Sequence, residues 1–445
     1  MKKRLVACLL AGTMMFSLTA CGSSSNDSGN TETSNTENET TTETTKDDAS
    51  EDATAETGEK EYSQGVTDTE IVIGNSAATS GAYAPVGVPF LAGMQAYLDY
   101  VNDGGGIDGR KITFDHITDD EFDPAKGKAA LSNLVEDEKV FAIVGHFGTP
   151  VVAATIDDLK EYGIPSVYFA TGIGQLYAEN ATSNDEGYNI FPVQPIYNTE
   201  GRIMAAYAAG KFNAKKVGII YTNDDAGTDL YSGAVAQLEQ LSGIDYVAEQ
   251  VTAGASDVSA AVTSLKNANV DFIVVASIQA TMPTIVKELA AQSVNKDCIT
   301  TYVNVSLAMS DAVREDIKGK FDVYGLGWVA YDDADALALY QEWAPEEYAM
   351  NAYAQTGWIA SHFFCEGLRR IEGQDITWEN FMDALNSGGP IKNPFGGVID
   401  FSNGQRLGTQ EMNLSKVVDV TDETPAGWTV EAPLSSIDSL LPHLK

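Results

Sequence analysis

The sequence predicts an α/β protein with two domains, each built around a mostly parallel sheet. Short apolar runs of strand length alternate with segments in which apolar residues recur at helical spacing, which is typical of βαβ units. This alternation begins again near Arg202, so the chain has two similar halves. The part of the 445-residue chain that follows Tyr62 is also too long for one compact core.

The first half contains four expected strands with helices between them. The first helix carries apolar residues at helical spacing from Leu91 to Val101, and Asp103 followed by three glycines ends it. Asp123-Pro124 and Thr149-Pro150 each place proline in a first turn after a polar residue, which indicates two further helix starts. The strands are expected at residues 71–73, 111–116, 141–144 and 166–169.

The second half repeats the pattern after a short extended segment at Phe191–Val193, which suits a crossover between lobes. A long helical stretch from Tyr348 to Arg370 and strands at 398–401 and 414–420 continue neither sheet, so we expect the chain to recross and complete both lobes. The tail from Glu431 to Lys445 should pack on a lobe surface. The strands of this half are expected at residues 217–221, 246–250, 272–275 and 299–303.

The start of the chain has the composition of a secretory signal. A basic start at Lys2-Lys3-Arg4 is followed by an apolar run that is too short to span a bilayer permanently. Cys21 directly after Leu-Thr-Ala resembles the lipobox of bacterial lipoproteins, which implies a signal peptide at 1–20 and a lipid anchor on Cys21. The alternative is an ordinary cleaved signal with a free cysteine. The signal and lipobox imply that everything beyond Cys21 lies outside the cytoplasm. Residues 21–66 are polar and acidic and predict a disordered linker.

Charge and cysteine content exclude several classes of function. The net charge of -37 disfavours nucleic acid and anionic lipid surfaces as partners. Cys298 and Cys365 are the cysteines left for the folded part, and a disulfide between them would be possible in an oxidising compartment. Because they fall in different lobes, we predict two buried thiols instead. We expect the protein to be a monomer.

Loops at the carboxyl ends of parallel strands are the expected binding positions, because they meet helix amino termini that present unpaired N–H groups. Three such loops are rich in small hydroxyl residues and glycine, and a ligand carboxylate is their natural occupant. Thr149 is alternatively a plain helix cap, and Gly172 with Gly174 a plain turn. The three loops are Ser80-Gly81-Ala82-Tyr83, Gly148-Thr149 and Ala170-Thr171-Gly172.

Three motifs in succession carry a family resemblance. Gly105–Ile112, Asp119–Pro124 and Val144–His146 resemble the signature series of the leucine/isoleucine/valine-binding family of type I periplasmic binding proteins, in order and spacing from about Thr67 to beyond Arg370. The resemblance implies two doubly wound lobes joined by three crossovers, with a small ligand enclosed between them and delivered to an ABC transporter permease. On this basis lobe 1 comprises residues 67–192 plus 329–403, and lobe 2 residues 193–328 plus 404–445.

The resemblance also implies site residues in the first lobe. The family's carboxylate-binding serine corresponds to Thr149, and the loop that holds the ligand's ammonium and carboxylate falls on Ala170, Thr171 and Gly172. Tyr83 matches the aromatic residue of the first loop less closely in position, and Ser80 lies in the same loop. The family's disulfide in this lobe is absent, because Phe122 and Gly148 stand where its cysteines would be.

The second lobe departs from the family pattern. Ala226 in Asp224-Asp225-Ala226-Gly227 stands where the family commonly has an aromatic ring, and no acid occurs near Tyr302-Val303-Asn304, where the ammonium partner should fall. Asp224 or Asp225 could replace that acid, because a buried ammonium requires an opposite charge. Both are equally well interpreted as loop acids that cap the following helix. For Gln279, too, a ligand contact and a purely structural role are both open. We therefore expect Asp225, Gln279, Tyr302 and Asn304 to select the ligand.

No enzyme signature is found. Gly-x-Ser-x-Gly, His-Glu-x-x-His and Cys-x-x-Cys patterns do not occur, and the histidines at 116, 146, 362 and 443 have no partner at fixed spacing. We expect no cofactor and no metal, and a packing role for His146. The predicted function is a lipid-anchored receptor of an ABC importer, which closes on a small amino acid or related carboxylate. A sensory lipoprotein of the same fold and, as a weaker alternative, a surface hydrolase remain open.

Overall fold

The computed structural model describes residues 61–445 except 184, 331–332, 437–438 and 440–445. The described residues belong to one compact unit. The signal peptide at 1–20, the lipidation of Cys21, residues 21–60 of the linker, and Leu440 and Leu441 in the tail lie outside the described part of the chain.

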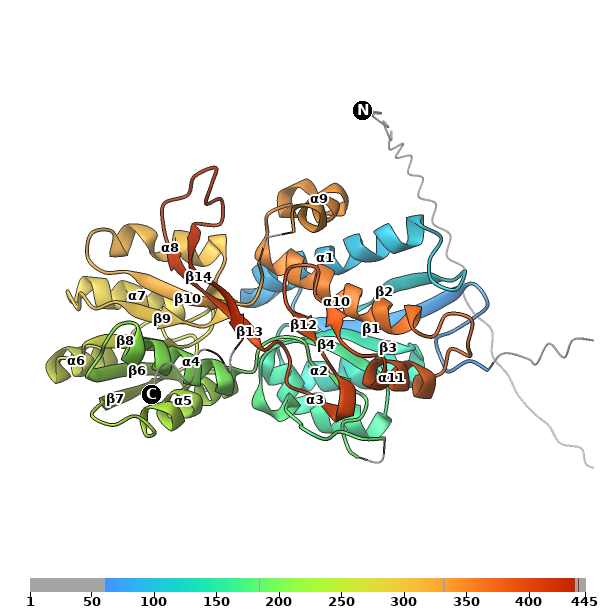
Figure 1. Cartoon of the computed structure of the whole chain (residues 1–445), viewed down its shortest axis with the longest axis horizontal. Coiled ribbons are helices and arrows are strands. Elements are labelled where there is room, and N and C mark those ends of the chain that lie inside the picture. Colours follow the sequence, from blue (N-terminus) through green and yellow to red (C-terminus); the bar gives the residue numbers. More distant parts are fainter. Residues whose placement is uncertain (1–60, 184, 331–332, 437–438, 440–445) are drawn as a thin grey trace, which may run out of the picture. The chain divides into compact units, whose positions relative to one another are not determined.

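The first sheet has five parallel strands in the order β2-β1-β3-β4-β5 (Figure 1). The chain therefore reverses its direction of winding between β1 and β3, and the loops after these two strands lie beside each other at that switch point. Apolar side chains cover both faces, as expected of a parallel sheet between helices. The strands are β1 (Glu70–Ala77), β2 (Lys111–Asp119), β3 (Ala142–Phe147), β4 (Ser166–Ala170) and β5 (Ile190–Phe191).

The second sheet has seven strands in the order β14-β13-β10-β9-β8-β6-β7. Its first five strands along the chain are parallel and repeat the winding of the first sheet, with a switch point between β6 and β8. The last two are antiparallel additions at the edge beside β10. The strands are β6 (Lys216–Thr222), β7 (Asp245–Val251), β8 (Phe272–Ala276), β9 (Cys298–Thr300), β10 (Val323–Gly327), β13 (Glu411–Val417) and β14 (Trp428–Ser436). The predicted fold class is confirmed.

Eleven α-helices of the described chain cover the two sheets. The short turns of helix that matter below are η1 (Gly81–Tyr83), η3 (Gly174–Leu176), η4 (Tyr302–Asn304) and η5 (Glu346–Tyr348). The helices are α1 (Ala84–Asp103), α2 (Pro124–Ser132), α3 (Thr149–Tyr162), α4 (Tyr197–Gly210), α5 (Asp225–Leu238), α6 (Ser259–Ala268), α7 (Met282–Ala291), α8 (Leu307–Ile317), α9 (Ala334–Trp343), α10 (Ala352–Arg369) and α11 (Trp378–Ser387).

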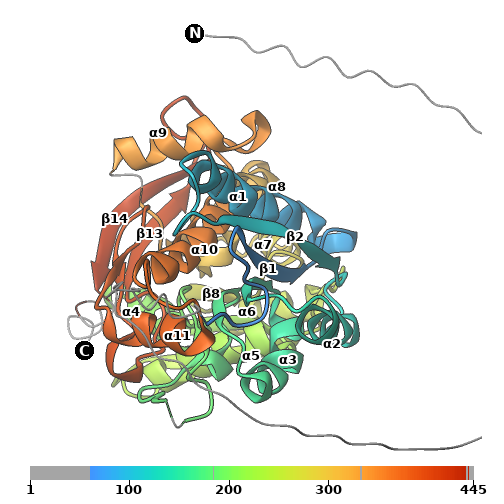
Figure 2. The same cartoon turned by 90° about the vertical axis from the view of Figure 1, so that its right-hand side faces the viewer.

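Two glycines bring α1 and α10 into backbone contact, and the helices lie side by side in Figure 2. A Cβ atom on Gly93 would lie 1.7 Å from the carbonyl oxygen of Ala354, and one on Gly357 would lie 1.9 Å from that of Phe90. Any side chain at either position would force the helices apart. This close crossing fixes the amino-terminal turn of α10, which carries Tyr353.

Several local predictions differ from the structure. The strand expected at 299–303 ends at Thr300 because the chain turns into η4, where Tyr302 and Asn304 are buried. The strand expected at 398–401 forms β12 (Val398–Ile399), which pairs with β11 (Ile391–Lys392) in a separate small sheet rather than completing a lobe sheet. Part of the predicted tail is the end of β14. The two thiols, Cys298 in β9 and Cys365 in α10, are free and buried as predicted.

The chain passes between the two sheets three times, and a buried arginine anchors the third passage. Arg406 is 1% exposed, and burial lowers its pKa to about 10. Its guanidinium lies over the ring of Phe191 at 4.6 Å and donates to the carbonyl of Tyr188 at 3.0 Å and to Asn386 Oδ1 at 2.8 Å. The segment before β13 is thereby tied to the first lobe.

We predict that Arg406→Met lowers the free energy of unfolding by about 3 kcal/mol, because buried carbonyls lose their donor and cannot find water. Urea unfolding of the two proteins measures this. Lys128→Met, which removes an exposed ion pair with Asp158, should change stability by less than about 1 kcal/mol. Equal effects of the two substitutions would show that Arg406 does not anchor the crossover.

Candidate functional site

A cavity of about 600 Å³ lies between the two lobes. Its walls come from the loops after β1, β3 and β4 of the first sheet and from those after β8, β9 and β10 of the second. The crossovers, the start of α10 and the β13–β14 hairpin complete it. The cavity thus lies where the carboxyl ends of both parallel sheets meet, which is the position expected for a ligand in this architecture.

The structure brings five of the ten predicted site residues together on the cavity wall, namely Tyr83, Thr149, Ala170, Gln279 and Tyr302. The other five do not line it, and each has another role or position. Ser80 donates its N–H to Asp119, and the Thr171 hydroxyl is hydrogen-bonded to that of Thr149. The Gly172 carbonyl accepts from Tyr197 N–H, and Asp225 lies in the first turn of α5. Buried Asn304 donates to the Ser277 carbonyl and to the Thr300 hydroxyl.

Thr149 is the first residue of α3 rather than its cap. Gly148 occupies the cap position with a φ of 92°, and no side chain satisfies the first N–H groups of the helix. The Thr149 hydroxyl instead lies 2.8 Å from that of Thr171, in a buried pair. The helix-cap role that the sequence offered for Thr149 is therefore wrong. The amino terminus of α3 faces the cavity, and the Thr149 hydroxyl lies beside it.

Aromatic rings form most of the wall near the first sheet. The rings of Tyr83 and Phe122 stack with their centroids 3.8 Å apart, and Phe122 meets the edge of Phe147. Burial raises the pKa of Tyr83, so its phenol is neutral at physiological pH. The polar side-chain groups of this wall include the hydroxyls of Tyr83, Thr149 and Tyr197.

Gln194, in the first crossover, connects the lobes through two hydrogen bonds. Its Nε2 donates to Tyr168 Oη of β4 at 2.6 Å, and its Oε1 accepts from Tyr302 O–H of η4 at 2.8 Å. The two phenols belong to opposite lobes, and all three side chains are buried. Because both amide groups are used, Gln194 fixes where Tyr302 stands on the cavity wall.

A buried carboxyl group holds the other side of η4. Glu200 of α4 accepts from the N–H of Tyr302 at 2.7 Å and from the Thr301 hydroxyl at 2.6 Å. Burial raises the pKa of Glu200 to about 8. Glu200 is thus the acid that lies beside the 302–304 segment, although it is fully buried and does not line the cavity.

Two more polar contacts join the lobes on either side of the cavity. Tyr353 of α10 lies 3.0 Å from the hydroxyl of Ser306, at the start of α8. Asp229 of α5 accepts the N–H of Gly174 in η3 at 2.7 Å. Both contacts would break if the lobes moved apart, so the structure has the lobes in contact around the cavity.

The acids at the start of α5 serve the helix. Asp224 caps α5 by accepting the N–H of Gly227 at 2.9 Å, and it also accepts from the Thr222 hydroxyl. Gln279 donates to the carbonyl of Val303 at 2.9 Å and lines the cavity from the second lobe. Of the two readings weighed for Asp224, the structure supports the helix cap.

Sequence reasoning missed the residues that the crossovers and the C-terminal hairpin contribute. Gln194 and Tyr197, Trp328, Tyr353 and Trp428 all line the cavity. Trp328 directly follows β10 and Trp428 begins β14, and neither strand is among those predicted from the sequence. The direction of such rings depends on tertiary packing.

Metal and membrane sites are not found in the described part of the chain. No group of three or more His, Cys, Asp or Glu side chains is arranged to hold a metal ion among the described residues. No helix within 61–445, gaps aside, is long and apolar enough to cross a bilayer. His146 is fully buried, and burial lowers its pKa to about 4, so it is neutral beside the Thr155 hydroxyl at 2.7 Å.

Comparison with known proteins gives consistent matches. The profile described as periplasmic binding protein matches residues 70–423. A Leu/Ile/Val-binding protein homolog 1 from Brucella suis is 24% identical over 331 residues, covering 74% of this chain and 85% of that protein.

Solved structures share the fold at low identity. A branched chain amino acid ABC transporter protein from Thermus thermophilus with bound valine has a TM-score of 0.71 and 16% identity, covering 84% of this chain and 98% of that one. A fatty acid ABC transporter substrate-binding protein from Thermomonospora curvata has a TM-score of 0.69 and 17% identity, covering 86% and 96%. At these identities the likeness shows the fold.

We predict that Glu200 makes the folded state less stable as the pH rises. Its folded pKa of about 8 lies above the usual value of about 4.5, so the folded state holds the proton more tightly and stability falls between these values. Glu200→Gln can keep both hydrogen bonds and should remove this decline, which is on the order of a few kcal/mol.

Urea unfolding between pH 5 and pH 9 measures the difference between wild type and variant. Glu161→Gln, at an exposed position of α3, is the matched control and should leave the pH profile unchanged. Parallel profiles for wild type and Glu200→Gln would show that the buried carboxyl does not titrate in this range.

Proposed function

Because this chain belongs to the periplasmic binding protein family, a family of extracytoplasmic binding proteins, we propose that it is the ligand receptor of an ABC importer. In this proposal it encloses one small carboxylate-bearing metabolite, an amino acid or a relative of one, between its lobes. It then delivers that ligand to a membrane permease. The supporting names are those of the relatives, which describe leucine, isoleucine or valine binding and ABC transport.

The observation that carries the proposal is the position of the α3 amino terminus. Thr149, the first residue of a 14-residue helix, lies on the wall of an interlobe cavity with its N–H and its hydroxyl, and Pro150 after it has no N–H. A helix amino terminus favours an anion through its unpaired donors and its partial positive charge. The hydrogen bond between the hydroxyls of Thr171 and Thr149 positions the Thr149 side chain. The small side chain of Ala170 leaves room for a ligand beside it.

The contacts between the two lobes around the cavity support the proposal that the lobes close on a ligand. We propose that residues 67–192 plus 329–403 and residues 193–328 plus 404–445 move as two bodies about the three crossovers. A ligand that touches Thr149 on one lobe and Tyr302 on the other selects the closed arrangement, because only there does it contact both. Cys21 with its lipid would hold the receptor at the membrane, and the acidic linker would extend it outward as a monomer.

A thermal-shift panel of amino acids and other small carboxylates tests the function directly. A ligand at a hundredfold excess over its dissociation constant stabilises the folded state by about 2.7 kcal/mol, which raises the melting temperature measurably. A melting temperature that no small carboxylate raises would contradict the proposal. Co-purification with a permease from detergent-solubilised membranes tests the partner.

We predict that Thr149→Val weakens binding of the best carboxylate in that panel by about tenfold or more, because a donor to a charged group is lost. Isothermal titration calorimetry measures the affinity, and urea unfolding shows that the fold is retained. Thr356→Val is a suitable control, since this threonine also lines the cavity but its hydroxyl donates to the carbonyl of Tyr353. Equal losses in the two variants would remove Thr149 from the site.

A further inference from the structure

We propose that the cavity takes a carboxylate that lacks an α-ammonium group and carries an extended, uncharged apolar tail. This inference rests on the proposed function, because it names the substrate class of the same cavity. It is carried by three features of the described residues, namely the absence of an acid near the carboxylate position, the size of the cavity and the apolar character of its outer end.

An ammonium group has no carboxylate partner in the inner part of the cavity. Among the described residues that line it, the carboxylates are those of Asp422 and Glu423, in the loop of the β13–β14 hairpin. Asp225 does not line the cavity. An α-amino acid would therefore place its ammonium among aromatic rings and amides, and burial without an opposite charge is costly.

The other acids near the cleft are already used inside the protein. Both oxygens of Glu200 accept hydrogen bonds from Thr301 and Tyr302, and its side chain has no exposed surface. Asp224 caps α5, and Asp229 accepts the N–H of Gly174. None of these three side chains lines the cavity.

The cavity is larger than a branched-chain amino acid requires. Its volume of about 600 Å³ corresponds to about twenty water-sized groups at the density of the liquid. A ligand that filled this space would have about twice the non-hydrogen atoms of valine or leucine. A ligand whose carboxylate lies at Thr149 must therefore extend well beyond this head to fill the space.

The end of the cavity away from Thr149 is apolar. Apolar side chains there come from the second crossover, from α9 and the segment before α10, and from β14. Val430 and Met350 are 60% and 43% exposed, so they offer apolar surface that a ligand in the cavity can cover. The residues concerned are Val329, Leu337, Met350, Val430 and Leu434.

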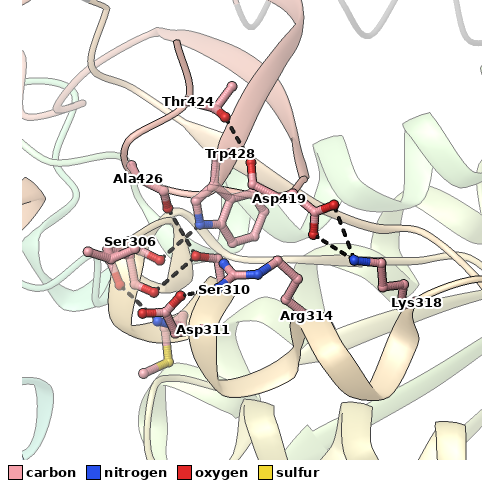
Figure 3. A network of polar contacts seen from close by, with 11 residues as sticks. Ser306, Ser310, Asp311, Arg314, Lys318, Asp419, Thr424, Ala426 and Trp428 are labelled. Carbon is pink, nitrogen blue, oxygen red and sulfur yellow. Dashed lines mark hydrogen bonds and ion pairs between the residues drawn. The ribbon is translucent and has the colours of Figure 1, made fainter. Parts of the chain in front are cut away.

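The hairpin that supplies this apolar wall is fixed to α8 (Figure 3). The Trp428 indole N–H donates to the carbonyl of Ser306 at 2.9 Å, so its ring is held by its one polar atom. Ser310 donates to the carbonyl of Ala426 at 3.0 Å, and Lys318 donates to Asp419 at 3.2 Å. The wall is therefore built before a ligand arrives, which reduces the entropy cost of binding.

Charge excludes a second carboxylate at the far end. No Lys, Arg or His occurs among the described residues that line the cavity. The charged side chains at the hairpin end are Asp422 and Glu423, and both are exposed. A distal carboxylate would lie near these acids on a protein of net charge -37, so a tail with a second negative charge does not fit.

Matched pairs of ligands test the missing ammonium. Calorimetry on the full chain, purified in detergent, compares leucine with 4-methylpentanoate and phenylalanine with 3-phenylpropanoate. Within each pair the ligands differ only in the α-ammonium group. We expect the carboxylate without the ammonium to bind at least about tenfold more tightly, a difference of about 1.4 kcal/mol.

A chain-length series tests the apolar tail. From butanoate to octanoate the affinity should rise about fourfold for each added methylene, which is the equivalent of about 0.8 kcal/mol. Val430→Asp should weaken octanoate by about tenfold and leave butanoate unchanged, because only the longer tail reaches β14. Val420→Asp is the matched control, since Val420 is an exposed valine of the same hairpin, 45% exposed, and does not line the cavity.

The outcomes separate this inference from the proposed function. Amino acids that bind as tightly as their partners without the ammonium, or tighter, would overturn the inference and leave the receptor function standing. An affinity that does not depend on tail length, or an equal effect of the two valine substitutions, would also overturn it. If no compound of either class binds, the proposed function itself fails.

Discussion

The carboxyl-terminal edges of two parallel sheets meet at one cavity, and the chemistry offered to a ligand follows from that constraint. Strand order places the loops after β1 and β3 together in one lobe and repeats the same winding in the other. Each lobe thus contributes helix amino termini and loop side chains to the same space. The cavity needs both lobes, because the groups that line it are divided between them.

Buried polar groups at and beside the first crossover position residues on the cavity wall. Gln194 uses both ends of its amide to connect a tyrosine of each lobe, and Glu200 holds the backbone of η4 from behind. Because these groups are fully hydrogen-bonded inside the protein, they position Tyr302, and both oxygens of Glu200 are already used. The hydrogen bonds that position η4 therefore also limit which ligand groups this side of the cavity can bind.

The sequence predicted those features that depend on local patterns. Asp123 caps α2 as expected, and the repeat of strands and helices predicted the fold class. Local patterns failed where a neighbour in space changes a residue's role. Threonine is a common residue at helix caps, but Gly148, with its positive φ, occupies the cap position of α3. The Thr149 hydroxyl is therefore hydrogen-bonded to that of Thr171. Trp428 lies more than 200 residues from Gln194 in sequence, and only the packing of β14 beside β13 brings it to the cavity.

The division of labour between the lobes explains how one fold serves different ligands. In the proposed function, the first lobe supplies the amino terminus of α3 for the anionic end of the ligand. The second lobe and the C-terminal hairpin supply much of the remaining surface through side chains, among them Tyr302 and Trp428. Because Lys318, Ser310 and the Trp428 indole fix the hairpin to α8, its apolar residues form a stable wall. If the proposed function holds, a change of side chains on this lobe and the hairpin would change the ligand class without altering either sheet.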